Sequence, residues 1–341
     1  MNSSTGTETV LYSFCPAGGS CTDGWGPGLN CCSSSVSDAA LIRDGKGNIY
    51  GTTALGGSGL SNCFFSLPCG VVFELDKAGQ ETVLYNFCSQ PSCADGLEPL
   101  HPLIRDTKGN LYGTTLANVF KIDTTGAETV LHNFTGYPTD GLIPATALMR
   151  DGGGNIYGTT YSGGAYGDGV AFRLDTTTGT ETLYSFPGGM QGQSPYGGLI
   201  RDVEGNFYGT TTAGGTSVDE SCTSDGCGTV FKLDAHGRES VLYSFTGANG
   251  DGANPSARLI RDAEGNLYGT TNAGGAHGSG TVFKLDNAGQ ETVLYSFCSL
   301  ASCADGQQPT TGLVQDAAGN LYGTTFYGGA NGSGVVFKIA P

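Results

Sequence analysis

One short phrase, Gly-Asn-x-Tyr-Gly-Thr-Thr, constrains the fold more than any other feature of this sequence. It occurs six times, with its asparagines at Asn48, Asn110, Asn155, Asn206, Asn266 and Asn320. A short apolar run that ends in Arg-Asp or a variant precedes each copy. Runs related to Val-Phe-Lys-Leu-Asp and Glu-Thr-Val-Leu-Tyr-Ser-Phe follow most copies. The chain is therefore one supersecondary unit repeated.

Each repeat predicts four antiparallel strands. Its four runs are rich in Val, Leu, Ile, Tyr, Phe and Thr, and Gly, Asp and Asn clusters separate them, as is typical of short strands joined by tight turns. We name these strands A to D, which in the fifth repeat are residues 259–262, 266–271, 280–286 and 291–297. Successive asparagines lie 62, 45, 51, 60 and 54 residues apart, near the long end of the range for propeller blades. The sequence predicts an all-β, six-bladed β-propeller in a single domain.

The phase of the repeats predicts how the propeller closes. The expected blades are residues 40–87, 102–134, 147–186, 198–245, 258–297 and 312–341, and the last blade also takes residues 8–14. The chain begins with a D-type run and ends with a C-type run at 335–339. We therefore expect the N-terminal strand to complete the sixth blade, a Velcro closure that leaves no free edge. The D-to-A and B-to-C connections then share one face, and we call them the upper loops.

Composition excludes several classes of partner. The net charge of −16 repels nucleic acids and anionic membranes, so we expect neither as a partner. No run of about 18 apolar residues is present to insert into a bilayer. The first residues, Met-Asn-Ser-Ser, are not a signal peptide, so we expect that a leader has been removed. We expect a monomer.

The cysteines indicate a secreted, extracellular or cell-surface protein. All twelve fall in local pairs: Cys15 and Cys21, Cys31 and Cys32, Cys63 and Cys69, Cys88 and Cys93, Cys222 and Cys227, Cys298 and Cys303. Disulfides across such short loops contribute roughly 2 kcal/mol each on the loop-closure model. Zinc is the alternative, but it favours Cys-x-x-Cys spacings, which these pairs lack. The adjacent pair forms either a vicinal bridge or two bridges to other cysteines.

The repeat also resembles a known family. The combination Leu-Ile-Arg-Asp-x-x-Gly-Asn-Leu-Tyr-Gly-Thr-Thr, then Gly-Gly, then Gly-Thr-Val-Phe-Lys-Leu-Asp resembles the GloVer-type tandem repeats of bacterial "choice-of-anchor" proteins, over essentially the whole chain. This resemblance implies a secreted or surface-anchored bacterial protein and no established activity. A weaker similarity to six-bladed propellers of the NHL kind rests on Asp-x-x-Gly-Asn-x-Tyr alone. Neither resemblance transfers a catalytic residue.

Aspartates of the D-to-A loops are one group of candidate ligand-binding residues. Asp-Gly-x-x-Pro or a close variant supplies Asp23, Asp95, Asp140, Asp251 and Asp305, which we expect around the top of the central channel. As turn formers they need no further role. The alternative is that several converge on a cation such as Ca²⁺, which takes six or more oxygen ligands. Neither interpretation requires a cofactor.

Departures from the repeat are better candidates for a catalytic site. The slot before the proline holds Glu98 in the loop that enters blade two, and His101 follows three residues later. The other copies of this slot hold Gly26, Ile143, Ser194, Asn254 and Gln308. A lone acid near a lone histidine suits acid–base chemistry. The alternative is a pair of solvated loop residues.

Aromatic residues of the upper loops are the remaining candidates. We expect ligand contacts from Trp25, Tyr137, Tyr161, Tyr166, Tyr196, Phe326 and Tyr327. Exposed rings suit the faces of sugars or the apolar anchors of a protein partner. The leading hypothesis is an extracellular propeller that binds a glycan or a protein. The alternatives are a carbohydrate-active enzyme, either glycoside hydrolase or polysaccharide lyase, and a structural surface repeat protein.

Overall fold

A computed structural model describes residues 10–14, 40–58, 69–145, 147–175, 178–216, 222 and 225–340. The chain forms two compact units. The first is Met1–Thr115 with Phe120–Thr129, and the second is Leu116–Val119 with Val130–Pro341. No helix in the described ranges has the length and apolar character needed to cross a membrane.

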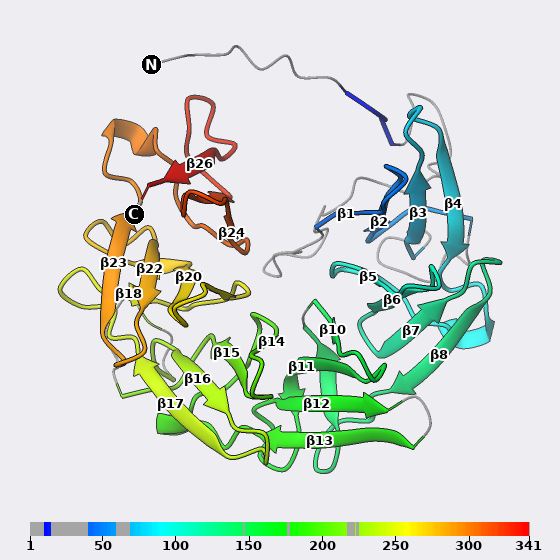
Figure 1. Cartoon of the computed structure of the whole chain (residues 1–341), viewed down its shortest axis with the longest axis horizontal. Coiled ribbons are helices and arrows are strands. Elements are labelled where there is room, and N and C mark those ends of the chain that lie inside the picture. Colours follow the sequence, from blue (N-terminus) through cyan, green and yellow to red (C-terminus); the bar gives the residue numbers. More distant parts are fainter. Residues whose placement is uncertain are drawn as a thin grey trace. The chain divides into compact units, whose positions relative to one another are not determined.

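The strands follow the repeat (Figure 1). The first sheet pairs its strands in chain order: β1 (Ile42–Arg43), β2 (Ile49–Thr53), β3 (Val71–Leu75) and β4 (Glu81–Asn86). The next sheet has the same order: β5 (Ile104–Arg105), β6 (Leu111–Thr114), β7 (Asn118–Ile122) and β8 (Glu128–Asn133). Each sheet is thus one A-to-D repeat.

The later repeats form sheets of the same kind. The third contains β10 (Met149–Arg150), β11 (Ile156–Gly163), β12 (Val170–Asp175) and β13 (Gly179–Ser185), with β9 (Gly141–Pro144) added on β11. The fourth contains β14 (Ile200–Arg201), β15 (Phe207–Thr211), β16 (Thr229–Leu233) and β17 (Glu239–Ser244). The fifth contains β19 (Ile260–Arg261), β20 (Leu267–Thr271), β22 (Thr281–Leu285) and β23 (Glu291–Ser296). The sixth contains β24 (Val314–Gln315), β25 (Leu321–Thr324) and β26 (Val336–Ile339).

These repeated sheets confirm the predicted fold, a six-bladed β-propeller. Among the described residues, the upper loops add the short ladder of β18 (Gly252–Ala253) with β21 (Ala273–Gly274) and the 3₁₀ turns η2 (Pro91–Cys93), η3 (Gly189–Gln191) and η4 (Ala301–Cys303). The described residues form no α-helix.

Phenylalanines make the core between successive blades. Phe186, which follows strand D of the third blade, meets Phe231 of β16 edge to face, with ring centroids 5.0 Å apart. The Phe231 ring in turn covers Gly209 of β15, where an added Cβ would lie 2.7 Å from the ring. The glycine of the repeated phrase is therefore required by the close approach of this ring.

The repeated Arg-Asp pair belongs to the scaffold. Asp202 accepts hydrogen bonds from the Asn206 backbone N–H at 2.8 Å, its side-chain Nδ2 at 2.8 Å and the Tyr208 hydroxyl at 3.0 Å. The neighbouring Arg201 lies 3.5 Å from the carboxylate of Asp151, one blade earlier. The pair closes its own turn and ties adjacent blades together.

The predicted closing strand lies only partly within the described residues. Its first two positions, residues 8 and 9, lie outside them, and residues 10–14 are described without strand pairing. Phe14 nevertheless meets Phe73 of β3 edge to face at 4.9 Å, as Phe186 meets Phe231. In the described part of the chain β26 pairs only with β25. A groove of about 530 Å³ lies beside β26 and is also lined by Tyr295 and Phe297. Pairing of the N-terminal strand with β26 stays a prediction.

Candidate functional site

The upper loops of the second unit are carried by a repeated backbone bridge. Asn254 has a left-handed conformation, with φ of 56°, which is uncommon for a non-glycine residue. Its N–H donates to the carbonyl of Cys227 in the preceding blade at 2.8 Å. Its carbonyl accepts from the N–H of Asn272 in the following blade at 3.1 Å. The loop thereby joins two blades through one residue.

The same bridge recurs on either side. The Ser194 N–H donates to the carbonyl of Asp168, and the Ser194 carbonyl accepts from the N–H of Thr212. In the same way, the Gln308 N–H donates to the carbonyl of Ser279, and the Gln308 carbonyl accepts from the N–H of Phe326. Both have φ of 56°. We call the residues joined in this way the bridge pairs: Ser194 with Thr212, Asn254 with Asn272, and Gln308 with Phe326. Their backbones are alike and their side chains differ, so a constant frame presents a variable surface.

The middle bridge pair carries polar atoms with unused hydrogen-bonding capacity. The Oδ1 atoms of Asn254 and Asn272 and the Oγ of Ser256 are buried and have no hydrogen-bond partner among the described residues. A buried acceptor without a partner costs about 1–3 kcal/mol. Rotation of either asparagine side chain toward a ligand that donates hydrogen bonds would recover part of that cost.

Exposed aromatic rings stand on these and neighbouring upper loops. Phe326 and Tyr327 are 50% and 46% exposed and meet edge to face at 4.5 Å. Tyr161 lies 6.2 Å from the half-buried Tyr196, ring centroid to centroid. Tyr137 and Tyr166 are also largely exposed. Trp25, like Asp23, lies outside the described residues.

The loop aspartates are engaged by their own loops. Asp305 accepts from the Tyr295 hydroxyl at 2.7 Å and from the backbone N–H and hydroxyl of Ser299 at 2.9 and 2.8 Å. Burial opposes ionisation of Asp305, but these bonds outweigh it and lower its pKa to about 2. Asp95 and Asp251 accept in the same way from Tyr85 and Tyr243.

Asp140 completes this pattern with a histidine in place of the tyrosine. Its Oδ2 lies 3.0 Å from Nε2 of His132 and accepts from the backbone N–H of Thr135 at 2.9 Å. Within the described ranges, carboxylates do not gather into a group able to hold a metal ion. These contacts favour the turn-forming role of the four aspartates over the alternative of a Ca²⁺ site.

Glu98 and His101 are buried rather than solvated, with exposures of 7% and 5%. Glu98 occupies the bridge position of the first unit, with φ of 54°, and its N–H donates to the carbonyl of Cys69 at 3.0 Å. Its Oε1 is buried without a hydrogen-bond partner in the described part of the chain. Burial raises the pKa of this carboxyl.

Three predicted disulfides are confirmed: Cys88–Cys93, Cys222–Cys227 and Cys298–Cys303. Cys69 is also disulfide-bonded. The remaining cysteines, Cys15, Cys21, Cys31, Cys32 and Cys63, lie outside the described residues. The upper loops are therefore braced by sulfur at three described places.

Sequence reasoning singled out Glu98 from the bridge slot and missed its counterparts. Asn254, Ser256, Asn272 and Gln308 carry no recognised motif. One signal could have found Asn254 and Gln308: the position immediately before the proline of Asp-Gly-x-x-Pro varies from copy to copy, whereas the Asp, Gly and Pro of the motif are repeated. Variable positions on a repeated scaffold are where specificity is expected.

The sequence matches the family model of the Gloeobacter/Verrucomicrobia repeat at residues 1–166 and 145–341. The chain belongs to this repeat family. Among curated proteins, none matches this repeat protein significantly.

Solved structures support the fold of the repeat protein. Virginiamycin B lyase from Staphylococcus aureus is similar with a TM-score of 0.54 at 11% identity, covering 89% of this chain and 84% of the lyase. A streptogramin B lyase gives a TM-score of 0.56 at 11% identity, with 91% and 85% covered. The extracellular domain of a protein described as a hybrid two-component system of B. thetaiotaomicron gives 0.53 at 12% identity, with 88% and 38% covered. At these identities the likeness concerns fold alone.

Proposed function

We propose that this repeat protein is a secreted or cell-surface binding module that holds a glycan on its upper loops. One observation carries the proposal: the bridge pair Asn254 and Asn272 offers two buried amide oxygens without partners, and the next bridge presents the exposed rings of Phe326 and Tyr327. Sugars bring hydroxyl donors for such oxygens and apolar C–H faces for such rings.

Two further features support an extracellular setting. Disulfides persist in oxidising compartments and are rare in the cytosol, and three are present in the described loops. The net charge of −16 disfavours polyanionic ligands, so a neutral glycan fits better than a sulfated one.

The aromatic contribution is tested by glycan arrays followed by calorimetry. We expect Phe326→Ala with Tyr327→Ala to weaken binding of the best neutral glycan by roughly tenfold, about 1.4 kcal/mol. Val203→Ala, a fully exposed position in the turn between β14 and β15, is the matched control and should bind normally. Equal binding by both variants would refute the proposal. Capture of a protein ligand with no glycan bound would replace it with a protein-binding module.

The amide contribution has a sharper signature. Asn272→Ala removes a buried oxygen that has no partner, so we expect glycan affinity to fall about tenfold without any loss in the free energy of unfolding. Asn266→Ala is the contrasting control, because Nδ2 of Asn266 donates to Asp262 at 2.7 Å. That variant should lose stability and keep its affinity. The opposite pattern would remove Asn272 from the site.

Glu98 supports a second candidate function, a carbohydrate-active enzyme. Burial raises the pKa of the Glu98 carboxyl, which favours the protonated form that a general acid needs. Release of products from a polysaccharide panel, abolished by Glu98→Gln in a fully folded variant, would establish it. If the native protein binds a polysaccharide but releases no products from it, the enzyme candidate is excluded and the binding module remains.

A further inference from the structure

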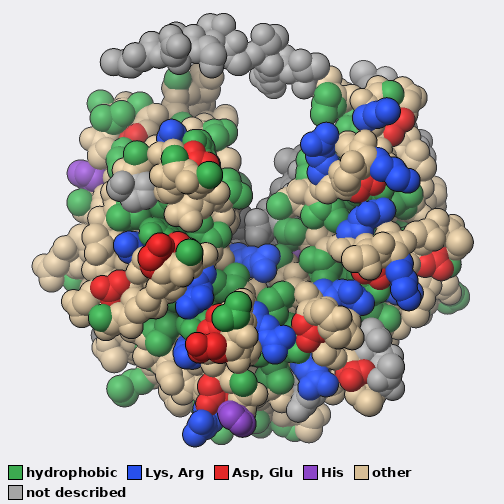
Figure 2. All heavy atoms as spheres, in the orientation of Figure 1, with side chains coloured by type: hydrophobic (Ala, Val, Ile, Leu, Met, Phe, Trp, Pro, Cys, Tyr) green, Lys and Arg blue, Asp and Glu red, His purple; other side chains and the backbone are tan. Residues whose placement is uncertain are grey.

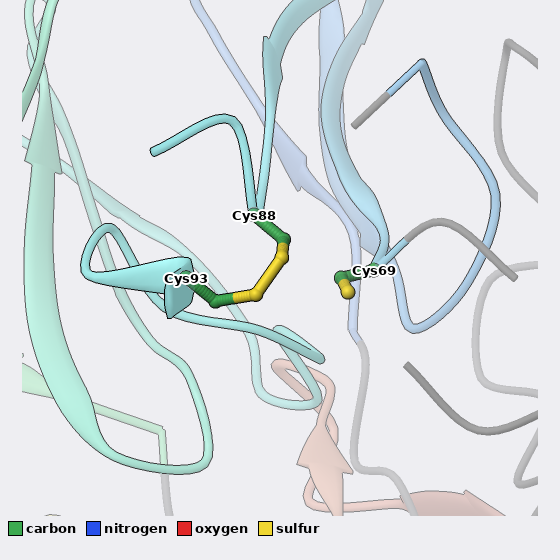
Figure 3. Close-up of side chains that lie close together, drawn as sticks. All are labelled: Cys69, Cys88 and Cys93. Atoms are coloured by element: carbon green, nitrogen blue, oxygen red, sulfur yellow. A yellow bond between two sulfur atoms is a disulfide. The ribbon is translucent and has the colours of Figure 1, made fainter. Parts of the chain in front are cut away.

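Three sulfur atoms of the first unit gather at the upper end of the first sheet (Figure 3). The Sγ atoms of Cys69, Cys88 and Cys93 all lie within 4.8 Å of one another. Cys88 and Cys93 form one disulfide, and Cys69 belongs to another, with a cysteine outside the described residues. Two different disulfides therefore come into near contact.

Strand register places Cys69 opposite Cys88. Strands β3 and β4 pair Val71 with Asn86, and the Phe87 N–H donates to the Gly70 carbonyl at 3.0 Å. One residue further along, both strands have ended and Cys88 has a left-handed φ of 56°, yet the Sγ atoms of Cys69 and Cys88 lie within 4.8 Å of each other. A disulfide spans Cα separations of about 4.4–6.8 Å, which is the range of residues that face each other across two neighbouring strands.

The three sulfur-bearing residues differ in exposure. Cys69 and Cys88 are fully buried, whereas Cys93 is partly exposed. A thiol reductant from solution therefore meets Cys93 first. Cys69 and Cys88 are shielded from solvent and lie close together, so they react with each other more readily than with external thiols.

We propose that this cluster is a thiol–disulfide exchange site, which converts the local Cys88–Cys93 bridge into a cross-strand Cys69–Cys88 bridge when a dithiol reductant acts on it. The reductant attacks Sγ of Cys93, the Cys88–Cys93 bond breaks, and its electron pair leaves on Cys88. The second thiol of the reductant then releases Cys93 and forms the oxidised cyclic disulfide.

The remaining step is redox-neutral. The Cys88 thiolate attacks Sγ of Cys69, a new S–S bond forms, and the former partner of Cys69 leaves as a thiolate that takes a proton from water. One equivalent of dithiol is oxidised and two protein thiols appear, on Cys93 and on the former partner. The product ties the loop before β3 to the end of β4, next to the loop that carries Glu98.

The fifth blade supplies an internal control. Its Cys298–Cys303 disulfide closes a loop with the same backbone bonds as the Cys88–Cys93 loop: Cys298 donates to Gly306 at 3.0 Å, as Cys88 donates to Gly96 at 3.1 Å. The place of Cys69 is taken there by Ser279, whose carbonyl accepts from the bridge residue Gln308 at 2.8 Å. The same loop therefore occurs once with a third sulfur and once with a hydroxyl.

Limited reduction of the native protein tests the proposal. Full-length protein is treated with substoichiometric dithiothreitol, free thiols are trapped with N-ethylmaleimide, and disulfide-linked peptides are identified by mass spectrometry. We expect a Cys69–Cys88 peptide with label on Cys93, whereas Cys298 and Cys303 appear only bridged to each other or both labelled. Absence of any link from Cys69 to Cys88 at every extent of reduction would overturn the proposal.

A gain-of-function variant separates exchange from misfolding. Ser279→Cys places a thiol at the equivalent position of the fifth blade, so we expect a disulfide between the introduced thiol and Cys298, with Cys303 free, in a protein of native circular dichroism. Cys69→Ala should lose the cross-strand product and give labelled Cys88 and Cys93 instead. A Ser279→Cys protein that is folded and retains only Cys298–Cys303 would contradict the geometric argument.

Discussion

One aspartate explains why asparagine and tyrosine recur in the repeated phrase. In the fifth blade Asp262 accepts from the Asn266 backbone at 2.8 Å, from Asn266 Nδ2 at 2.7 Å and from the Tyr268 hydroxyl at 2.9 Å. Burial opposes ionisation of Asp262, but these bonds outweigh it and lower its pKa. Asparagine and tyrosine therefore recur together because both donate hydrogen bonds to the same aspartate.

We expect loss of the equivalent aspartate in another blade to destabilise the fold. Asp202→Ala deletes the acceptor of the equivalent bonds in the fourth blade, so we expect the free energy of unfolding to fall by about 2–3 kcal/mol. Urea denaturation of this variant is compared with Val203→Ala, which changes the exposed neighbour and should stay within about 0.5 kcal/mol of the native protein. Equal stabilities of the two variants would show that the turn does not depend on its aspartate.

Four of the D strands, β4, β8, β17 and β23, begin with a glutamate, and these four glutamates are half-buried. Burial, and then the nearby charge of Asp251, raise the pKa of Glu291 to about 7. Burial, and then Asp95, raise the pKa of Glu128 to about 7. Burial also raises the pKa of Glu239 to about 7. The outer strands therefore favour the protonated acid.

This shift makes the fold more stable in mild acid. The folded pKa of about 7 lies above the value of 4.5 for a free glutamate, so the folded state holds more protons between these values. The contribution is fully present below pH 4.5 and is lost as pH rises to about 7. We expect urea midpoints to fall over this interval, and the slope to be shallower in Glu291→Gln. A flat profile would exclude the effect.

The elements were more predictable than the surface they carry. Short apolar runs and the Gly, Asp and Asn clusters between them are local signals, and they located the strands and their connections. The short spacings between cysteines located the three disulfides of the described residues. The bridge pairs were not predictable in this way, because the left-handed φ of Asn254 follows from bonds to two different blades. The approach of Cys69 to Cys88 likewise depends on strand register, which a spacing in sequence does not reveal.

At the scale of the whole molecule, one ring contact recurs at the junctions between blades. A phenylalanine at the end of each D strand meets a phenylalanine of the next C strand in Phe87–Phe120, Phe134–Phe172, Phe186–Phe231, Phe245–Phe283 and Phe297–Phe337. Phe14 makes a sixth contact of this kind with Phe73. Residues 10–14 thus occupy the place of a D strand that precedes the first blade. Figure 2 shows the side chains in the orientation of Figure 1, with basic and acidic groups both present on the face in view.

A propeller of six blades has six junctions, and the sixth ring pair is supplied by the N-terminal run. From this we predict that residues 8–14 supply strand D of the sixth sheet, in which Val336 of β26 is 81% exposed. We expect deletion of residues 1–14 to lower the melting temperature by several degrees, about 2–4 °C for each kcal/mol lost, and deletion of residues 1–7 to leave it unchanged. Hydrogen exchange provides the direct measurement, because amides at one edge of β26 are protected only if a strand pairs there. Equal exchange of Val336–Ile339 in both truncations would mean that the N-terminal run completes no sheet, and that the contact between Phe14 and Phe73 is packing alone.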